Sequence, residues 1–340
     1  MINKRYRLIG KGNIKETFIE ENVSTENILV RPTYLSICAS DQRYYNFDRP
    51  PDVLQKKLPM ALIHEAMGTV VYDPLQHVAV GQNVILVPLL QNVDDKIVAE
   101  NYKTENFFRS SGYDGFLQDI VSQPRDRAVI IPNGLANETL AFTELMSVAV
   151  HSIKRFLAKS HSNRGILGIW GDGNLGFILT LLLKKMCPDS RVVVFGLTRE
   201  KLNLFTFADD ICLVSEVGNI RVDHAFECVG GNGSKYALNQ IIDIINPEGC
   251  ISLLGVSEDP PSVNTRLILE KGLLLVGNSR SSLSDYFTVL DLLRCNHDII
   301  GYLQCLVSSV CRIRCVADIH FAFASDLTKE FGKTILKWEI

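Results

Sequence analysis

The stretch Ile166-Leu-Gly-Ile-Trp-Gly-Asp-Gly-Asn-Leu-Gly-Phe-Ile-Leu-Thr-Leu181 decides how the second half of the chain folds. Its first five residues are apolar and predict a buried strand, and the apolar run from Phe177 to Leu183 predicts a helix. The glycines of Gly171-x-Gly173-x-x-Gly176 stand between them. The first permits a tight turn, the second lets the backbone approach a pyrophosphate, and the third lets the helix pack closely on the strand. Glycines also cluster in ordinary turns, but the flanking strand and helix favour a nucleotide-binding turn, with phosphates at the positive end of the helix.

From Gly165 onward, strand and helix patterns alternate. Strands are predicted at Ile166–Trp170, Arg191–Phe195, Ile211–Val214, Asp223–Cys228, Cys250–Leu254 and Leu273–Gly277. Helices are predicted at Leu175–Met186, Gly233–Ile245 and Asp285–Arg294. This alternation is typical of a doubly wound parallel sheet.

The first part of the chain is instead rich in short β-type segments separated by turns, which predicts a compact antiparallel β-body. Its predicted strands are Asn27–Arg31 and Tyr34–Cys38 on either side of a break at Pro32, Thr69–Tyr72, Val84–Val87, Gly115–Val121 and Ala128–Ile131. Residues 88–109 are expected to form an irregular insert, residues 137–157 a helix capped by Asn137, and Lys333–Trp338 a strand. The sequence therefore predicts an α/β chain with a β-rich domain over residues 1–147, completed by 286–340, and a dinucleotide-binding domain over 148–285.

Composition excludes several functional classes. The chain has 340 residues, 46% hydrophobic and 21% charged, as is ordinary for a soluble globular protein. A net charge of −3 gives no indication of nucleic-acid or membrane-surface binding, and the apolar runs are too short to span a bilayer. No signal peptide is evident after Met1, and nine cysteines without disulfide-like spacing favour a reducing, cytoplasmic setting.

Four residues of the first part are of the types that bind catalytic zinc: Cys38, His64, Glu65 and Glu144. Thiolate, imidazole and carboxylate donors hold such a metal at three positions and leave a fourth open. Taken singly, each has a plainer interpretation. Cys38 could be a small buried side chain, the His64-Glu65 pair could lie on the surface, and Glu144 could be a helix-start charge.

The placement of these residues changes the interpretation. With Cys38-Ala-Ser-Asp41 and His64-Glu65 upstream of a nucleotide fold, the chain resembles the zinc-dependent medium-chain dehydrogenase/reductase family over essentially its whole length. The resemblance implies a GroES-like catalytic domain beside a Rossmann domain. Carried over residue by residue, it makes Cys38, His64 and Glu144 the zinc ligands, Glu65 an adjacent or exchanging ligand, and Ser40 the proton relay. Gly115 and Phe116 match the family's Gly-Gly-Phe strand entry.

The chain departs from many relatives in one respect. They carry a second, structural zinc held by four closely spaced cysteines, whereas no cysteine lies between Cys38 and Cys187 here. We therefore expect no structural zinc. The late group Cys305, Cys311 and Cys315 has no Cys-x-x-Cys pair and is not expected to bind a metal.

The segment after the second Rossmann strand bears on cofactor choice. In NAD-binding folds an acidic residue there binds the ribose hydroxyls, but Phe195-Gly196 is followed by Leu197-Thr198-Arg199-Glu200-Lys201. Gly196 leaves room for a 2′-phosphate that Thr198, Arg199 and Lys201 could bind, which favours NADP. The alternative is that the two cations merely solvate a helix start. The predicted cofactor-binding residues are Gly171, Gly173, Asn174, Leu175, Gly176, Thr198, Arg199 and Lys201.

Longer segments resemble one branch of the family, the ribulose-5-phosphate reductases. They are Ser36–Tyr45, Lys57–Met60 leading to Ile63–Glu65, Phe108–Phe116, Ile169–Gly176, Phe226–Gly231 and Leu253–Ser257. This resemblance implies zinc- and NADPH-dependent reduction of D-ribulose 5-phosphate to D-ribitol 5-phosphate, which supplies CDP-ribitol for teichoic-acid or capsule polymers. It also implies a homo-oligomer, with a dimer expected, and functional or physical coupling to a ribitol-5-phosphate cytidylyltransferase.

A sugar phosphate requires a cation near the metal, and Arg43 or Arg109 could bind it bidentately, although both could equally be solvated surface charges. Two other functions stay open. One is NAD-dependent oxidation of a free polyol, as in sorbitol dehydrogenase, against which the missing acid near Gly196 argues. The other is a redox-inactive nucleotide-binding protein, against which Cys38, His64 and Glu144 argue.

Overall fold

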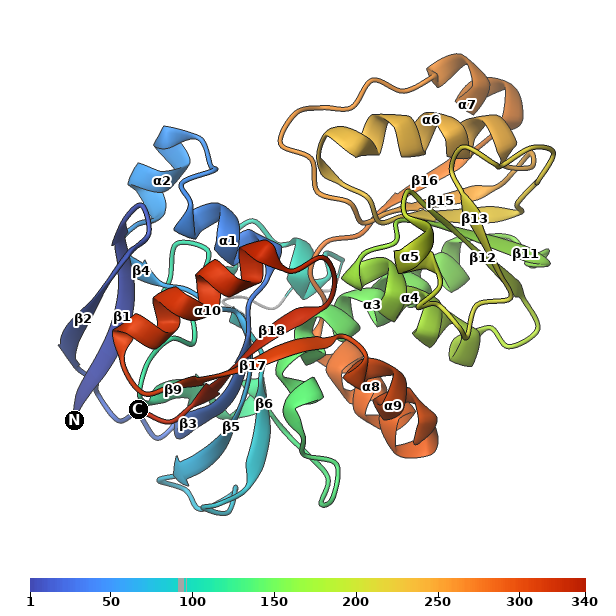
Figure 1. Ribbon diagram of the computed structural model, residues 1–340. Coiled ribbons are helices and arrows are strands. Elements are labelled where there is room, and N and C mark those ends of the chain that lie inside the picture. Colours follow the sequence, from blue (N-terminus) through green and yellow to red (C-terminus); the bar gives the residue numbers. More distant parts are fainter. Residues whose placement is uncertain (91–94, 96) are drawn as a thin grey trace. The chain divides into compact units, whose positions relative to one another are not determined.

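The computed structural model describes residues 1–90, 95 and 97–340 (Figure 1). The chain forms two compact units, one made of Met1–Glu144 with Ser282–Ile340 and the other of Leu145–Ser281. Part of the insert predicted over residues 88–109 lies outside the described residues, namely 91–94 and 96. Among the described residues, no helix is long and apolar enough to cross a bilayer.

The first unit is built on a seven-stranded sheet of order β10-β6-β5-β3-β18-β17, with β9 also paired to β3. These strands are β3 (Asn27–Ser36), β5 (Glu65–Tyr72), β6 (Asn83–Leu86), β9 (Val121–Pro124), β10 (Ala128–Ile130), β17 (Val307–Ile313) and β18 (Lys333–Trp338). Smaller sheets contain β1 (Ile2–Gly10), β2 (Asn13–Glu20) and β4 (Met60–Ala61), and β7 (Leu89–Leu90) with β8 (Phe107–Phe108). Because β17 and β18 come from the C-terminal segment, the sheet is completed only by the end of the chain.

Helices connect the strands of the first unit. They are α1 (Ala39–Tyr45), α2 (Pro51–Lys57), α8 (Leu283–Cys295), α9 (Asp298–Gln304) and α10 (Val316–Thr328), with short 3₁₀ helices at Glu100–Tyr102, Arg125–Arg127 and Glu138–Phe142. Figure 1 shows α10 beside β17 and β18. Its Phe323 belongs to the same buried apolar cluster as Tyr6, Leu35 and Trp338, so the helix closes the core of the unit.

Three predictions for this unit need correction. Strand β3 runs through Pro32, because the proline lies at a register shift where a missing N–H is tolerated. The strand predicted at Gly115–Val121 does not form, and β9 begins only at Val121. The backbone N–H groups of Gly115 and Phe116 instead donate to the carbonyls of Ala61 and Ile63, both at 2.7 Å. A Cβ at Gly115 would lie 2.3 Å from the Ile63 oxygen, so this crossing requires glycine. The insert is not wholly irregular, since β7 and β8 pair within it.

The predicted helix after Asn137 is two helices. A 3₁₀ turn at Glu138–Phe142 precedes α3 (Thr143–Lys159). The Asn137 side chain accepts a hydrogen bond from the Thr139 N–H at 2.9 Å, which confirms the predicted cap.

The second unit is a six-stranded, all-parallel sheet of order β13-β12-β11-β14-β15-β16. Its strands are β11 (Ile166–Trp170), β12 (Arg191–Gly196), β13 (Asp210–Leu213), β14 (His224–Glu227), β15 (Cys250–Leu253) and β16 (Leu274–Gly277). Its helices are α4 (Asn174–Met186), α5 (Arg199–Leu202), α6 (Ser234–Ile244) and α7 (Thr265–Lys271), with a 3₁₀ turn at Gly231–Gly233. Figure 1 shows α6 and α7 on one face and α4 on the other. The predicted α/β class, a strand-rich domain plus a doubly wound parallel sheet, is confirmed.

Candidate metal centre and nucleotide-binding turn

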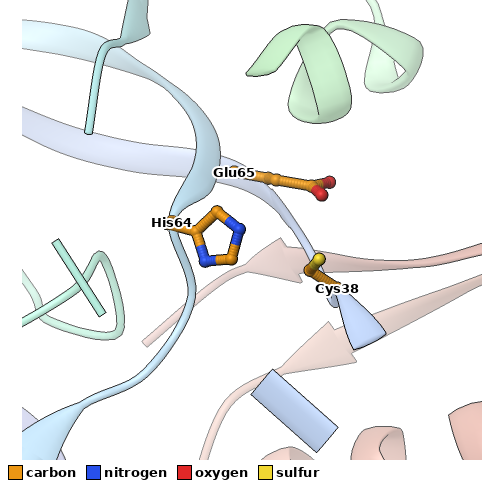
Figure 2. Close-up of side chains that lie close together, drawn as sticks. All are labelled: Cys38, His64 and Glu65. Atoms are coloured by element: carbon orange, nitrogen blue, oxygen red, sulfur yellow. The ribbon is translucent and has the colours of Figure 1, made fainter. Parts of the chain in front are cut away.

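Cys38, His64 and Glu65 come together at one end of the large sheet of the first unit. Cys38 follows β3, and His64 and Glu65 stand at the start of β5, which pairs antiparallel with β3. Their ligand atoms all lie within 4.8 Å of one another, and Figure 2 shows sulfur, ring and carboxylate directed toward a common space. Within the described part of the chain, no other group of three His, Cys, Asp or Glu side chains lies this close.

The buried carboxylate of Asp41 holds the two segments that carry these residues. Its Oδ2 accepts the backbone N–H of Cys38 at 3.0 Å, and its Oδ1 accepts the N–H of Ile63 and the hydroxyl of Ser110, both at 2.9 Å. Ile63 has a φ of 70°, which a β-branched residue rarely adopts. The bond from Ile63 to Asp41 therefore helps to hold a strained turn that directs the next side chain, His64, toward the centre.

Asp41 also sets the electrostatics of His64. The two are buried, with Nδ1 of His64 3.7 Å from Oδ1 of Asp41. Although burial alone would lower it, the carboxylate holds the pKa of His64 well above its ordinary value. In turn, burial would raise the pKa of Asp41, but the imidazole holds it below its usual range. A carboxylate behind an imidazole is the arrangement that orients a metal-binding histidine and raises its basicity.

Glu65 is paired with a lysine that no sequence motif indicates. Lys333, the first residue of β18, places Nζ 2.9 Å from Oε1 and 2.8 Å from Oε2 of Glu65. Both side chains are buried. Burial lowers the pKa of Lys333, but the charge of Glu65 outweighs this effect and raises the pKa above its ordinary value. The strand Lys333–Trp338 also contains Thr334 and a second lysine, Lys337, so its composition gave no local signal that Lys333 would be the buried and paired one.

Glu144 lies in the first turn of α3 and is also buried. It is not one of the three side chains within 4.8 Å of each other. Burial raises the pKa of Glu144 to about 7, with His64 opposing and Glu65 reinforcing the shift. Its charge is thus coupled to the centre, and its role as third zinc ligand stays a prediction.

Ser40 lies in the first turn of α1, two residues after Cys38. Its hydroxyl accepts a hydrogen bond from Nη2 of Arg49 at 3.0 Å. Arg49 belongs to the loop between α1 and α2, and no local sequence pattern links it to Ser40. The predicted proton relay is therefore bonded to a guanidinium.

The two predicted phosphate ligands have different surroundings. Arg43 lies half-buried in the last turn of α1. Arg109 directs its guanidinium inward: Nε donates to Gln123 at 3.1 Å, while Nη1 and Nη2 donate to the carbonyls of Asp114 and Ser122 at 3.2 and 2.7 Å. Burial lowers the pKa of Arg109 to about 10. These bonds fit a structural cation better than a substrate ligand.

The glycine turn of the second unit has the geometry that the sequence predicted. Gly171 has a φ of 128° and donates its N–H to the Phe195 carbonyl at 2.9 Å. A Cβ at Gly176 would lie 2.0 Å from the Gly171 oxygen, whereas one at Gly173 would meet nothing within 4 Å. Because α4 begins at Asn174 with no capping side chain, its first N–H groups face an open approach. The turn therefore fits a pyrophosphate.

A pocket lies beside this turn, and it is the natural place for the adenosine end of a dinucleotide. Residues from both the turn and the strands around it line the pocket, among them Asp172, Gly196, Val214, Cys228, Tyr236 and Gln240.

Gly196 lines this pocket, and the expectation that it leaves room for a 2′-phosphate stays a prediction, but an acid lies next to it. Oδ2 of Asp172 accepts the backbone N–H groups of Leu197 and Thr198 at 2.9 and 3.0 Å. A Cβ at Gly196 would lie 2.7 Å from Asp172, so the carboxylate fills that position. An acid is missing from the end of β12 in the sequence, yet the glycine turn supplies one there in space. Sequence counting missed it because the two residues lie on different segments.

Arg199, at the start of α5, forms an exposed ion pair with Glu216. The guanidinium is therefore held near the end of β12, where a cofactor phosphate would compete with Glu216 for it. The roles of Thr198, Arg199 and Lys201 in cofactor binding stay predictions.

Comparison with known proteins identifies the family. Residues 24–133 match the model of the alcohol dehydrogenase GroES-like domain. Over 100% of both chains, the sequence is 46% identical to ribulose-5-phosphate reductase of Bacillus spizizenii and 48% identical to ribulose-5-phosphate reductase 2 of Staphylococcus aureus. The chain belongs to the zinc-type medium-chain dehydrogenase/reductase family. The crystal structure of S. aureus TarJ in complex with NADPH is also similar, with 44% identity, full coverage of both chains and a TM-score of 0.89.

Membership of this dehydrogenase/reductase family confirms the resemblance drawn from Cys38, Ser40 and the His64-Glu65 pair. It also gives the buried donor group a chemical meaning. A thiol, an imidazole and nearby carboxylates are the donors that catalytic zinc takes, and the backing of His64 by Asp41 is what such a ligand requires. The residues present fit this metal.

Proposed function

We propose that the chain reduces D-ribulose 5-phosphate to D-ribitol 5-phosphate with NADPH and one catalytic zinc. The observation that carries this proposal is the buried donor group Cys38, His64 and Glu65, in a chain that matches proteins named ribulose-5-phosphate reductase over its whole length. The product would supply CDP-ribitol for teichoic-acid or capsule polymers, in functional or physical coupling to a ribitol-5-phosphate cytidylyltransferase.

In this proposal Cys38, His64 and Glu144 hold the zinc, and Glu65 is an adjacent or exchanging ligand. When bound, zinc supplies a Lewis acid that polarises the C2 carbonyl of the open-chain ketose. The ammonium of Lys333 compensates the charge of Glu65, so that a thiolate and two carboxylates can share one buried zinc site. Asp41 orients His64 for binding.

Ser40 moves the proton. NADPH, when bound, would supply the hydride for C2, and the Ser40 hydroxyl would donate its proton to the former carbonyl oxygen. The hydrogen bond from Arg49 supports this role, because a guanidinium stabilises the oxygen that loses the proton.

The cofactor would be bound by the glycine turn, with its pyrophosphate at the N-terminus of α4, where Asn174 and Leu175 follow Gly173. Thr198, Arg199 and Lys201 would hold the 2′-phosphate. The carboxylate of Asp172 is compensated by two backbone N–H groups, which reduces its repulsion of that phosphate. An acid at this position also favours the alternative, NAD-dependent oxidation of a free polyol.

We also propose a homodimer formed through β16. This strand is at the edge of its sheet and exposes Leu274 and Leu275 by 40% and 37%, and Leu269 of the adjacent α7 is 81% exposed. Exposed apolar edge strands are usually covered. We place the protein in the cytoplasm, in accord with nine cysteines that are all free.

An NADPH-oxidation assay tests the main proposal. The substrates are D-ribulose 5-phosphate, D-xylulose 5-phosphate and unphosphorylated ribulose. We expect the highest kcat/KM with ribulose 5-phosphate, and NADPH to be preferred over NADH. Equal activity on ribulose and ribulose 5-phosphate, or a preference for NADH, would instead support the free-polyol alternative.

A further inference from the structure

We infer that Arg49 and Lys57, held against the ring of Tyr44, form the subsite that binds the phosphate of the substrate. This inference rests on the proposed function, because it names the residues that would distinguish a phosphorylated ketose from a free one. It differs from the sequence-based expectation, which pointed to Arg43 and Arg109.

Arg49 is joined to the metal centre through one hydrogen bond. Its Nη2 donates to Oγ of Ser40, which lies two residues after the donor Cys38. Its guanidinium carbon lies 5.0 Å from the ring centroid of Tyr44, a cation–π contact. Tyr44 is only 2% exposed, so the ring is a fixed support. A planar guanidinium held in this way is already oriented for bidentate contact with phosphate oxygens.

Lys57, the last residue of α2, approaches the same ring. Its Nζ lies 5.9 Å from the Tyr44 centroid and donates to Oγ of Ser111 at 3.0 Å. The preceding residue, Ser110, donates its hydroxyl to Asp41, the carboxylate behind His64. Lys57 is therefore connected to the metal centre by a second route, independent of Ser40.

The charges of these two residues favour an anion. Both cations lie within 6 Å of the centroid of one buried aromatic ring, so a phosphate dianion beside that ring would be attracted by two positive charges. The chemistry of the substrate fits this position. In ribulose 5-phosphate, three carbon–carbon bonds and an ester link separate C2 from the phosphorus, so the phosphate must bind beside the reacting centre and not at it.

Arg109 is a weaker candidate. Its three donor groups are directed to Gln123 and to the carbonyls of Asp114 and Ser122, inside the first unit. Binding a substrate there would break bonds that hold two segments together, whereas Arg49 and Lys57 donate to the hydroxyls of Ser40 and Ser111. Hydroxyls are neutral and also suit a phosphate as additional donors.

The test compares kcat/KM for D-ribulose 5-phosphate with that for D-ribulose in wild type and variants. Lys57→Gln is the cleaner variant, because Lys57 does not contact Ser40. Arg49→Gln and Arg49→Lys separate loss of charge from loss of shape. Lys56→Gln, exposed on the same helix, is the matched control. We expect Lys57→Gln and Arg49→Gln each to lower the phosphate preference by about tenfold to a hundredfold. Arg49→Lys should lower it less, and Lys56→Gln should not change it.

Inorganic phosphate supplies a second measurement that does not depend on turnover of the free sugar. As a competitive inhibitor against ribulose 5-phosphate, it should bind more weakly to both Gln variants in the same proportion. Thermal unfolding identifies any variant that fails to fold, in which case Arg49→Lys and Lys57→Gln carry the test.

The outcomes separate two kinds of failure. If Lys57→Gln and Arg49→Gln lose the same factor on both sugars, with unchanged phosphate inhibition, the subsite is overturned while ribulose-5-phosphate reduction stands. If wild type reduces both sugars equally, the proposed function fails. Weaker inhibition by phosphate in the Gln variants would then still support an anion site at Tyr44.

Discussion

The side chain of Asp172 covers Gly196, so that a Cβ added at position 196 would lie 2.7 Å from both Cβ and Oδ2 of Asp172. The same Oδ2 accepts the N–H groups of Leu197 and Thr198. One carboxylate from the glycine turn therefore fixes the loop that follows β12, and the loop requires glycine at position 196 for that reason.

This relationship predicts the result of a cofactor switch. Gly196→Asp should weaken both NADH and NADPH binding, because the new side chain collides with Asp172 and costs about 1–3 kcal/mol of overpacking. Removing the obstacle in Asp172→Gly/Gly196→Asp should restore NADH use and leave NADPH use poor. KM for both cofactors, measured for the single and double variants, checks this. A single Gly196→Asp variant that already prefers NADH would contradict the packing argument.

Loss of the metal should abolish activity without unfolding the second unit, which holds the glycine turn. We expect Cys38→Ser and His64→Ala to reduce the metal content from about one zinc per chain to near zero, and to abolish turnover. NADPH binding, followed by fluorescence titration, should change little, because the glycine turn belongs to the other unit. Cys295→Ser, at an exposed cysteine, is the control. Full turnover in zinc-depleted His64→Ala would rule out the zinc mechanism.

Loss of one partner of the buried Lys333–Glu65 ion pair should strongly destabilise the protein. Lys333→Met keeps the side-chain length but leaves the Glu65 carboxylate buried without its cation, which should lower the free energy of unfolding by about 3–5 kcal/mol. Adding Glu65→Gln to the Lys333→Met background should recover much of this loss, because the uncompensated charge disappears. Urea unfolding of the metal-free protein measures both. Equal stability of Lys333→Met and wild type would show that the ion pair is not formed.

A buried histidine in the second unit predicts a pH dependence of stability. His224 is fully buried, and its Nδ1 accepts the N–H of Cys250 at 3.0 Å. Burial lowers the pKa of His224 to about 4, and the neighbouring His161 adds to this. His224 therefore binds a proton more tightly in the unfolded chain than in the folded one. The free energy of unfolding is at its full value above a pH of about 6.5 and falls by on the order of 3 kcal/mol as the pH decreases toward 4.

His224→Gln tests that origin, because glutamine retains an acceptor and does not titrate. Its urea midpoint should be lower at pH 7.5, through lost packing against Phe156, but should change less between pH 7.5 and 5 than that of wild type. His77→Gln, at an exposed histidine, should keep the wild-type slope. An unchanged slope in His224→Gln would assign the acid sensitivity to other groups.

The edge strand gives a prediction about assembly. Leu274→Lys with Leu275→Lys places two charges on the exposed edge of β16, which should prevent pairing with a second copy. Light scattering should then change from a dimer to a monomer, with the thermal midpoint of the monomer still cooperative. Phe321→Lys, at an exposed residue of α10 in the first unit, should leave the dimer intact. A dimer that persists in the double variant would place the interface elsewhere.

The sequence by itself determined the elements whose signals are local. Ile166–Trp170 has the bounds that its apolar run predicted, because a strand buried on both faces is continuous in hydrophobicity. Lys333–Trp338 has the bounds that its β-type residues predicted. The glycine turn was equally readable, since its spacing expresses backbone sterics within one short segment. Where the backbone conformation of a segment depends on a partner far away in the sequence, the prediction from the sequence was wrong. Gly115–Val121 has a strand composition, yet its backbone bonds to Ala61 and Ile63 across a close crossing.

For the site, residue types and family resemblance were sufficient to name Cys38, His64 and Glu65, but only the tertiary structure decided their partners. Three contacts join residues that no local sequence pattern links. They are Lys333 with Glu65, Arg49 with Ser40, and the Asp172 carboxylate with the loop after Gly196. Charge compensation, hydrogen bonding and steric fit act over a few ångströms in space, so they become visible only when folding brings separate segments together.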